Sequence, residues 1–505
     1  MKLSHLLYED EYSMGKHPDT VEIDEITCDA YAVRRNALFV CLKESREECI
    51  ALLDQACENG ASAAIVGEVD IAVTDFSIPI FQVKNPRATY AYLWSRHEGK
   101  PERRVRIIGV TGTNGKTSTA KMLTEIFSEG GHKTAYIGTL GCSFQGRVYH
   151  APHGADENRL STMTTPDPDL LYPILRQMAD DGAEYIIMEV SSHALALEKV
   201  APISFLAGLF TNLTPEHLDF HKSMDAYLEA KSRLFSASQI GILNADDAAA
   251  SVLAPMCKYK SYLCGAVHTA EITANEIKME NADGVSYVLL DRETELPIFV
   301  PIPGSFTVYN SLLAAVCALK LGICPSVVQA ALAHVSGIQG RMERITDEGA
   351  PFSILIDYAH TPHALLSLLK EARRFRTPGG HILLLFGCGG DRDKSKRASM
   401  GRIAEEYADL IYVTSDNSRS EEPAAIIEDI LEGISDKSKC RVVLSRYEAI
   451  RQAISELSEN DILLLAGKGH ESYEIDKNGM HWFDERKIVN SLLEKKKRGD
   501  TVCEN

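Results

Sequence analysis

The chain has 505 residues, of which 45% are hydrophobic and 25% are charged, as in ordinary globular proteins. At about 150 residues per domain, this length predicts roughly three domains, each able to bury its own core. The formal net charge of −18 argues against nucleic acid or an anionic membrane as the main partner. The composition therefore favours a multidomain enzyme of small molecules.

The cysteines and the N-terminus bear on the compartment. None of the 12 cysteines forms a CxxC pair, and Cys28, Cys41, Cys142 and Cys388 lie in apolar or glycine-rich surroundings typical of reduced thiols. The N-terminus turns acidic before any stretch of signal-peptide length, and no run approaches about 20 apolar residues. We expect a cytoplasmic protein, with no membrane partner, that acts as a monomer.

The first hundred residues alternate between strand-like and helical stretches. Apolar runs at 37–42, 62–69 and 78–83 predict strands, and 49–60 has the pattern of a helix. The charged stretch at 96–106 is interpreted as a linker. These features predict a small α/β domain at the N-terminus.

A second pattern starts near Val105. The β-branched run at 104–110 is followed by a glycine-containing turn, and then by a segment that places Met122, Leu123, Ile126 and Phe127 on one helical face. The turn is GTNGKTS at 112–118, a variant of the phosphate-binding loop in which Val110 stands where a glycine is usual. Strand, loop and helix in this order predict a nucleotide-phosphate site.

The loop residues are suited to a nucleotide. Main-chain N–H groups at a helix N-terminus bind phosphate oxygens, Lys116 can reach the β- and γ-phosphates, and the Thr117 hydroxyl can bind Mg²⁺. The candidate ATP-binding residues here are Gly112, Thr113, Asn114, Gly115, Lys116, Thr117 and Ser118.

Acidic and imidazole side chains follow two later apolar runs. The segment MEVSSHAL at 188–195 places Glu189 and His193 at a strand end, and 211–235 is dense in histidine and aspartate. Carboxylate oxygens and imidazole suit Mg²⁺ or Mn²⁺ beside phosphates. A divalent metal near the phosphate loop is expected.

Beyond residue 350 the alternation is plainer. Apolar runs within 352–363, 381–393, 410–419 and 461–471 each continue directly into a polar or glycine-containing loop. Ligands of open parallel sheets bind at the carboxyl ends of the strands, so these loops are predicted to line one cleft.

Several motifs together resemble the Mur ligase family over roughly residues 105–475. They are, in order, GTNGKTS, MEVSSHAL, TNLTPEHLDFH with YLEAK, PGSFTVYN, GRMER, DYAHTPHAL and GCGGDRDKSKR. The resemblance implies a three-domain α/β fold with a central P-loop mononucleotide-binding domain and a C-terminal Rossmann-like domain. The implied ranges are 1–103 for a UDP-sugar domain, 104–340 for an ATP and Mg²⁺ domain, and 341–505 for an amino-acid domain.

The resemblance also implies a reaction. Enzymes of this family transfer the γ-phosphoryl group of ATP to a carboxylate, and an amine then attacks the acyl phosphate to form an amide. The motifs are similar to those of members that add meso-diaminopimelate to UDP-N-acetylmuramoyl-L-alanyl-D-glutamate in peptidoglycan synthesis. A carboxylate needs this activation because oxide is a poor leaving group whereas phosphate leaves easily.

Carried over residue by residue, the resemblance assigns roles. Lys116, Glu189, His217 and Lys231 are implied to be catalytic, with Thr117 and Glu189 on one Mg²⁺, His217 on a second, and Lys231 carbamylated and in the metal site. ATP contacts are implied at Asn310, Arg341 and Asp357. The nucleotide-sugar peptide is implied to meet Thr164, Thr165, Ser191, Ser192 and Lys199. The amino acid is implied to meet Arg392, Asp416, Asn417, Arg419, Gly467 and Glu471.

The chain departs from the family pattern at a few positions. Ala30 and Tyr31 stand where D-S-R continues after Asp29, Lys199 replaces an arginine, and Ser418 replaces the proline of D-N-P-R. These changes keep open a ligase for a different carboxylate, and L-lysine in place of diaminopimelate. Two other hypotheses are a folylpolyglutamate-synthetase-type ligase and an ATPase that ligates nothing.

Overall fold

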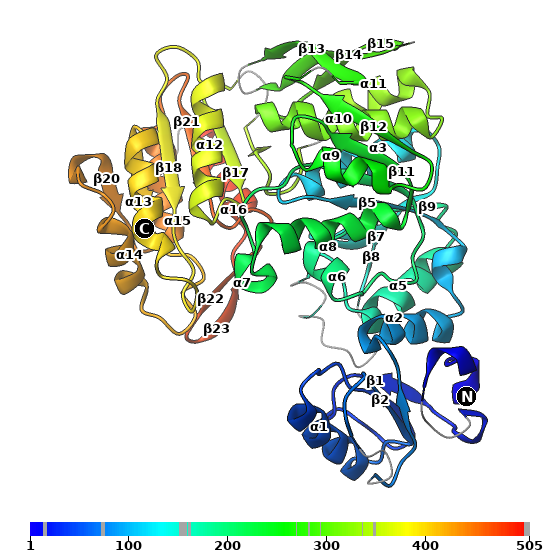
Figure 1. The fold of residues 1–505 in the computed structure, drawn as a ribbon. Helices are drawn as coiled ribbons and strands as arrows, with labels where there is room; N and C mark the ends of the chain where they lie inside the picture. The colour runs from blue at the N-terminus through cyan, green and yellow to red at the C-terminus, as the bar shows by residue number, and fades with distance from the viewer. Residues whose placement is uncertain are drawn as a thin grey trace. The chain divides into compact units, whose positions relative to one another are not determined.

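The computed structural model describes residues 1–13, 18–71, 76–150, 159, 163–268, 270–280, 283–292, 294–335, 337–346 and 350–498. The chain divides into two compact units, one of Met1–Glu271 with Leu313–Ile323 and one of Ile272–Leu312 with Cys324–Asn505. Helices and strands alternate in both units (Figure 1), which confirms the predicted α/β class.

The first unit begins with a small parallel sheet. Its strands are β1 (Glu25–Thr27), β2 (Ala37–Val40), β3 (Ala63–Val66) and β4 (Ile80–Gln82), paired in that order. Its helices are α1 (Arg46–Glu58) and α2 (Pro86–His97), and its short 3-10 turns are Leu3–His5, Glu9–Glu11 and Pro18–Thr20. The strands predicted at 37–42, 62–69 and 78–83 are therefore confirmed.

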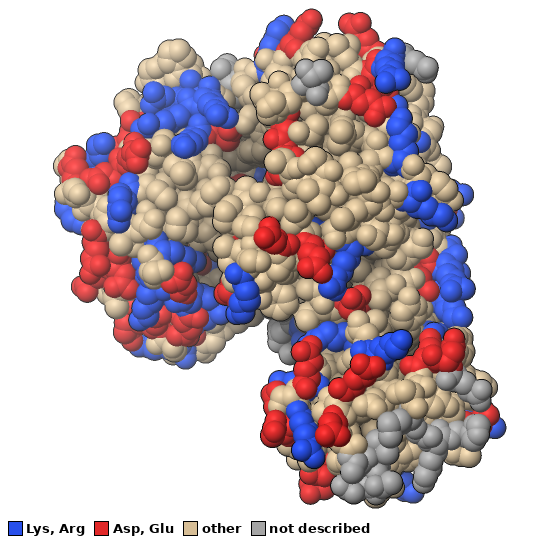
Figure 2. All heavy atoms as spheres, in the orientation of Figure 1, with Lys and Arg blue, Asp and Glu red and all other residues tan. Residues whose placement is uncertain are grey.

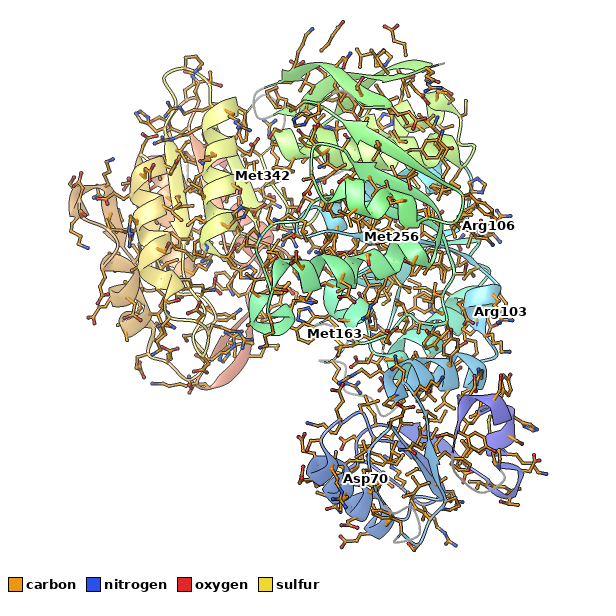
Figure 3. The ribbon with its side chains drawn as sticks, viewed as in Figure 1. Asp70, Arg103, Arg106, Met163, Met256 and Met342 are labelled. Atoms are coloured by element: carbon orange, nitrogen blue, oxygen red, sulfur yellow. The ribbon has the colours of Figure 1, made fainter. Side chains whose placement is uncertain are left out.

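The charged stretch at 96–106 is ordered, which corrects its interpretation as a linker. It contains the end of α2, a 3-10 turn at Pro101–Arg103 and the first residue of β5. Glu102 is buried and accepts a hydrogen bond of 2.9 Å from the Ser95 hydroxyl. Arg103 and Arg106, labelled in Figure 3, flank the start of the next sheet.

A larger sheet follows in the same unit. Its strands are β5 (Arg106–Thr111), β6 (Thr134–Gly138), β7 (Gly141–Phe144), β8 (Arg147–Tyr149), β9 (Tyr185–Glu189), β10 (Phe205–Phe210), β11 (Ser238–Asn244) and β12 (Lys260–Gly265). They are ordered β12-β11-β10-β5-β9-β6-β7-β8. The pairs from β12 to β6 are parallel. The loops after β5, β9 and β10 therefore leave adjacent strands at one edge.

Helices connect these strands. They are α3 (Lys116–Glu129), α5 (Pro168–Asp180), α6 (Ser192–Ala196), α7 (Leu218–His221), α8 (Met224–Ser236) and α9 (Ala250–Leu253), with a 3-10 turn at Ala254–Met256. The predicted apolar face of α3 is buried in full at Met122, Leu123, Ile126 and Phe127. The expected strand, loop and helix around the phosphate loop are thus confirmed.

The second unit opens with an antiparallel meander. Its strands are β13 (Ile272–Met279), β14 (Val285–Asp291) and β15 (Thr294–Val300). Helix α10 (Ser305–Lys320) has residues in both units, and α11 (Pro325–Ala333) follows it.

The rest of this unit is a six-stranded sheet. Its strands are β16 (Glu343–Arg344), β17 (Ser353–Asp357), β18 (Ile382–Phe386), β19 (Leu410–Val413), β20 (Cys440–Val442) and β21 (Ile462–Ala466), ordered β16-β17-β21-β18-β19-β20. All pairs except β16 with β17 are parallel. The loops after β17, β18, β19 and β21 therefore share one edge, as predicted.

The helices of this sheet are α12 (Pro362–Phe375), α13 (Lys396–Tyr407), α14 (Pro423–Leu431), α15 (Arg446–Glu456) and α16 (Glu485–Arg498), with a 3-10 turn at Lys437–Lys439. A hairpin of β22 (Tyr473–Asp476) and β23 (Gly479–Trp482) precedes α16. Helix α16 includes the lysine-rich stretch at 494–498.

Three general features complete the description. The described cysteines are free thiols, and Cys41, Cys142 and Cys388 are buried while Cys28 is half-buried. No helix within the described part of the chain is long and apolar enough to cross a membrane. On the face shown in Figure 2, acidic and basic side chains are interspersed.

Candidate functional site

The phosphate loop is held in an unusual backbone conformation. Gly115 precedes α3 at a φ of 85°, and Gly112 has a φ of 151°, both in the region that favours glycine. A Cβ atom on Gly112 would collide with the Thr211 hydroxyl. The Thr211 hydroxyl also donates to the main-chain oxygen of Asn114 at 2.6 Å, so the loop after β10 supports the phosphate loop.

Lys116 lies over its own loop. Its ammonium donates to the main-chain oxygens of Gly112 at 3.0 Å and Thr113 at 2.8 Å. The ammonium therefore sits at the turn whose N–H groups would meet a phosphate. This is the placement that a lysine of a phosphate loop requires.

Glu189, at the end of β9, is fully buried and surrounded by donors. Its carboxylate accepts from the Thr117 hydroxyl at 2.9 Å, the Thr139 amide at 3.0 Å and the Thr139 hydroxyl at 3.1 Å. The Tyr136 hydroxyl also donates to it. Thr117 and Glu189 form a pair of hard oxygen ligands beside the phosphate loop, which suits Mg²⁺. Tyr136 and Thr139 carry no motif, so the sequence did not indicate them.

The expected carboxylate-substrate loop packs against the end of β9. The Thr165 hydroxyl donates to the main-chain oxygen of Glu189 at 2.9 Å and accepts from the Ser191 amide at 3.0 Å. Thr164 accepts from the Thr139 hydroxyl at 3.3 Å. This loop therefore lies next to Glu189, the candidate Mg²⁺ ligand.

Lys199 already has an anionic partner. Its ammonium lies 2.7 Å from the Asp167 carboxylate and donates to the main-chain oxygen of Thr165 at 3.4 Å. Burial raises the pKa of Asp167, but Lys199 and Arg159 together outweigh burial and leave this pKa below its usual range. The point charge that replaces the family arginine is thus tied to the substrate loop.

The rings of three histidines and a tyrosine form a cluster beside the cavity residues. The ring of His193 lies 4.8 Å from that of His217 and 5.5 Å from that of His221, and His221 stacks on Tyr227 at 4.9 Å. Burial, and then the neighbouring imidazoles of His217 and His221, lower the pKa of His193 to about 4. His221, whose Nε2 lies 2.9 Å from the Ser192 hydroxyl, was not predicted from the sequence.

Lys231 is the deepest cation of this region. Its side chain is 1% exposed, and its ammonium lies 4.4 Å from the centre of the Tyr227 ring. Burial, and then the charge of Lys116, lower the pKa of Lys231 well below its usual value. The Tyr227 hydroxyl lies 3.2 Å from the Thr113 hydroxyl, which links this lysine to the phosphate loop.

Some of these groups line a cavity of about 350 Å³. The predicted residues that line it are Gly112, Lys116, Thr164, Thr165, Ser191, Ser192, Lys199, His217 and Lys231, joined by Met163, His193, Leu197 and Tyr227. Figure 3 labels Met163 in this part of the first unit. Among the described residues, no group of three or more histidine, cysteine, aspartate or glutamate side chains could hold a metal ion.

The second unit gathers another set of predicted residues. Asn417, after β19, donates from Nδ2 to the Glu471 carboxylate, after β21, at 2.8 Å. The Asp416 carboxylate accepts from the main-chain N–H of Asn417 at 2.6 Å. A Cβ on Gly467 would lie 2.8 Å from the same Asp416 carboxylate. Burial, and then Asp416, raise the pKa of Glu471. Two carboxylates thus lie close together at this edge.

Arg419 is anchored in spite of Ser418. Its Nη1 donates to the main-chain oxygens of Gly390 at 2.9 Å and Asn417 at 3.2 Å, and its amide donates to Ile475 at 3.0 Å. Ser418 is buried. A Cβ built on Gly389 would lie 3.1 Å from Arg419 and 3.8 Å from Arg392, so the two arginines flank the same glycine.

The residues expected to contact ATP outside the phosphate loop also belong to the second unit. The Asp357 carboxylate accepts from the amides of Met342 and Ala359, both at 2.9 Å. Burial raises the pKa of Asp357, and the nearby Arg341 opposes that shift. Asn310 is buried on α10. Met342 is labelled in Figure 3.

The departures near Asp29 lie after β1. Ala30 is buried, whereas Tyr31 is 75% exposed and its amide donates to the Asp29 carboxylate at 2.9 Å. Of the predicted site residues, those from 112 to 231 lie in the first unit and those from 310 to 471 lie in the second.

Comparison with known proteins decides the family. Residues 110–318 match the Mur ligase middle domain, and residues 340–469 match the Mur ligase, glutamate ligase domain. The chain is 38% identical to a UDP-N-acetylmuramoyl-L-alanyl-D-glutamate--2,6-diaminopimelate ligase of Clostridioides difficile, over 98% of this chain and 100% of that one. The chain belongs to the Mur ligase family. A ligase of the same name from Syntrophomonas wolfei is 37% identical, over 98% of this Mur ligase and 99% of its own length.

Solved structures agree with this assignment. A UDP-N-acetylmuramoyl-L-alanyl-D-glutamate--2,6-diaminopimelate ligase matches 98% of this Mur ligase and 99% of its own chain, with a TM-score of 0.70 and 26% identity. A folylpolyglutamate synthase of Mycobacterium tuberculosis matches 82% of this Mur ligase and 95% of its own chain, with a TM-score of 0.59 and 16% identity, which shows a shared fold alone. The predicted three-domain α/β fold is confirmed, and this Mur ligase is an ATP-dependent, ADP-forming amide ligase.

Proposed function

We propose that this Mur ligase joins meso-diaminopimelate to UDP-N-acetylmuramoyl-L-alanyl-D-glutamate in peptidoglycan synthesis. The observation that carries the proposal is the identity of 38% and 37% to two ligases named for this reaction, over 98% of this chain and at least 99% of theirs. Matches of this extent leave no domain of either relative without a counterpart. The groups of the candidate site are proposed to supply the chemistry.

The choice of amino acid rests on the second unit. Meso-diaminopimelate carries a carboxylate and an ammonium at its far end, for which Arg419 and Glu471 are suitable partners. The bonds from Arg419 to the main-chain oxygens of Gly390 and Asn417 come from Nη1. Asp416, Asn417, Gly467 and Arg392 complete the proposed amino-acid site. L-Lysine lacks the far carboxylate, so it would gain nothing from Arg419.

The activation step uses the phosphate loop. In the proposed reaction, a carboxylate oxygen of the substrate attacks the γ-phosphorus of ATP and ADP leaves. The amine of the amino acid then attacks the acyl carbon, phosphate leaves with its bonding electrons, and the amine loses a proton. The phosphates of ATP are proposed to bind residues 112–118, with Lys116 at the turn. The rest of ATP is proposed to bind Asn310, Arg341 and Asp357. Thr164, Thr165, Ser191, Ser192 and Lys199 are proposed to hold the carboxylate substrate.

A divalent metal fits the oxygen and imidazole groups beside the phosphate loop. Thr117 and Glu189 are proposed to bind one Mg²⁺, and His217 with a carbamylated Lys231 a second. Bound Mg²⁺ would neutralise the approaching phosphate and carboxylate anions. Support comes from the 2.9 Å contact of Thr117 with Glu189 and from the burial of Lys231, since a buried amine favours the neutral form that takes up CO₂.

The ranges of the domains are part of the same proposal. Residues 1–103 are proposed to bind the UDP end, 104–340 ATP and Mg²⁺, and 341–505 the amino acid. We propose a cytoplasmic location because ATP and a nucleotide-linked substrate are both used. The monomeric state and the lack of a nucleic-acid or membrane partner stay predictions.

A second candidate function keeps the chemistry and changes the carboxylate. Ala30, at the position of the family's serine, is buried and has no polar group, and Tyr31, at the position of the family's arginine, presents an exposed ring. These replacements weaken the expected polar contacts to the nucleotide. They favour, as the alternative, a ligase whose carboxylate substrate lacks UDP.

One experiment separates the candidates. Purified protein is incubated with ATP, Mg²⁺ and UDP-N-acetylmuramoyl-L-alanyl-D-glutamate, with meso-diaminopimelate, L-lysine or no amino acid. ADP release and product mass are then measured. A tripeptide product with diaminopimelate alone supports the proposal. ATP binding without any product supports the alternative, and ADP release without an amino acid indicates an ATPase.

A further inference from the structure

Lys468, in the loop after β21, is fully buried at 0% exposure and is absent from the predicted site residues. Burying an ammonium is costly unless it is well paired. Its closest carboxylate oxygen, on Asp416, is 3.9 Å away, beyond hydrogen-bond distance. Its hydrogen bonds go instead to the Asn417 Oδ1 at 3.2 Å and the main-chain oxygen of Tyr473 at 2.7 Å. Its strongest contacts are therefore with an amide and a carbonyl.

These contacts determine which way the Asn417 amide points. Its Oδ1 accepts from Lys468 and also from the Ile475 amide at 3.0 Å, so its Nδ2 faces the Glu471 carboxylate at 2.8 Å. A flipped amide would place its NH₂ group against two donors and its oxygen against a carboxylate. With Lys468 in place, only one orientation is satisfied.

The orientation matters for Glu471. One of its oxygens is occupied by Asn417, and burial together with the nearby Asp416 raises its pKa. Asn417 and the positive charge of Lys468 act in the opposite direction. Lys468 thus both orients a hydrogen bond to this carboxylate and compensates two neighbouring anions.

We propose that Lys468 is a positioning residue for amino-acid selection, which orients the Asn417 amide so that Glu471 presents its other oxygen to an ammonium group of the incoming amino acid. This inference rests on the proposed function, because it takes Glu471 to be part of the amino-acid site. Lys468 itself need not touch the amino acid.

The test compares Lys468→Met with Lys477→Met, a matched control in the turn between β22 and β23. The Lys477 side chain is 64% exposed and pairs with the exposed Glu422. In Lys468→Met, the KM for meso-diaminopimelate should rise about tenfold to hundredfold, since a buried amide loses its fixed partner. In Lys468→Met, the preference for meso-diaminopimelate over L-lysine should also fall. In Lys477→Met, the KM for ATP and the thermal midpoint should stay at wild-type values. An unchanged KM and preference in Lys468→Met would overturn the inference.

Two further variants cover a Lys468→Met protein that fails to fold. Lys468→Gln keeps a neutral donor and should give a smaller rise in KM, whereas Asn417→Asp keeps the acceptor for Lys468 but loses the donor to Glu471 and should give the full rise. If the KM for meso-diaminopimelate rises in neither variant, the inference is wrong.

A spectroscopic readout separates this inference from the proposed function. The side-chain amide signals of ¹⁵N-labelled Asn417, assigned by their loss in Asn417→Asp, should shift and exchange faster in Lys468→Gln than in wild type. Wild-type protein that makes no tripeptide overturns the proposed function and with it the role in selection. Unshifted amide signals overturn the positioning of Asn417, whatever the activity.

Discussion

The hydroxyl of Thr117, in the first turn of α3, donates to the carboxylate of Glu189 at the end of β9, across 2.9 Å. Because β5 and β9 are neighbouring parallel strands, the phosphate loop and this carboxylate leave the sheet at the same edge. The register Val110 to Glu189 sets their spacing. Sheet pairing thus brings together residues more than seventy positions apart.

Glu189→Gln should remove activity and also loosen the fold locally. The substituted NH₂ group would face hydroxyl and amide donors from Thr117, Tyr136 and Thr139, so at least one buried donor would lose its acceptor. We expect a loss of ligation rate of at least about a thousandfold and a destabilisation of about 1–3 kcal/mol. ADP release and urea unfolding measure these effects. Glu184→Gln, on a half-exposed side chain, should leave both unchanged.

Gly112→Ala should disrupt ATP binding. A Cβ at this position would collide with the Thr211 hydroxyl, and the φ of 151° disfavours other residues. Gly131→Ala is the control, since its φ of 82° is also strained but nothing lies within 4 Å of an added Cβ. Calorimetric titration with an ATP analogue should show at least about tenfold weaker binding for Gly112→Ala. Equal affinities of the two variants would show that the collision is relieved by movement of Thr211.

Lys231 should make stability depend on pH in a defined direction. Because burial and Lys116 lower its pKa in the folded state, the unfolded chain binds more protons, and stability rises as pH increases from the folded pKa towards about 10.4. In CO₂-free buffer, Lys231→Met should be the more stable protein at pH 7, and its advantage should shrink as pH rises towards 10. Urea unfolding at several pH values, with Lys222→Met as an exposed control, tests this. A constant difference would contradict the lowered pKa.

Carbamylation of Lys231 can be observed directly. Protein equilibrated with ¹³C-bicarbonate should show a carbamate carbon signal that is absent from Lys231→Met and present in Lys222→Met. The burial of Lys231 beside Tyr227 favours the neutral amine that this reaction needs. Identical spectra of wild type and Lys231→Met would exclude carbamylation of this residue.

Arg446 and Glu485 form an ion pair in which neither side chain is exposed, 2.7 Å apart. Arg446 also donates to the main-chain oxygens of Ser415 and Ala466, at the ends of β19 and β21. Glu485→Gln would leave a buried guanidinium without its counter-charge, so a loss of about 3–5 kcal/mol is expected. Glu422→Gln removes a partner from an exposed pair and should cost no more than about 1 kcal/mol. Urea unfolding of both variants checks the difference, and similar losses would contradict it.

The amino-acid sequence alone determined the alternation of elements and the motifs. Apolar runs at 352–363, 381–393, 410–419 and 461–471 each became a parallel strand, because a strand covered on both faces must be continuously apolar. The glycines at 112 and 115 and the following Lys116 were sufficient to predict the phosphate loop, since their conformational demands are local. The family resemblance likewise came from residues in fixed local order.

Only the tertiary structure decided which side chains complete each site. Tyr136 and Thr139 lie outside the motifs, and His221 ends the TNLTPEHLDFH motif without an assigned role, yet sheet pairing and helix packing place these residues against Glu189 or Ser192. Lys468 lies in a glycine-rich motif, but its burial and its bond to Asn417 depend on two loops that meet only at the sheet edge. Lys231 is a further example, because a helix lysine is predicted from sequence to be exposed to solvent, whereas packing against Tyr227 buries it. Local chemistry can be predicted from residue order, whereas pKa values and hydrogen-bond partners depend on burial and proximity, which arise only when the chain has folded.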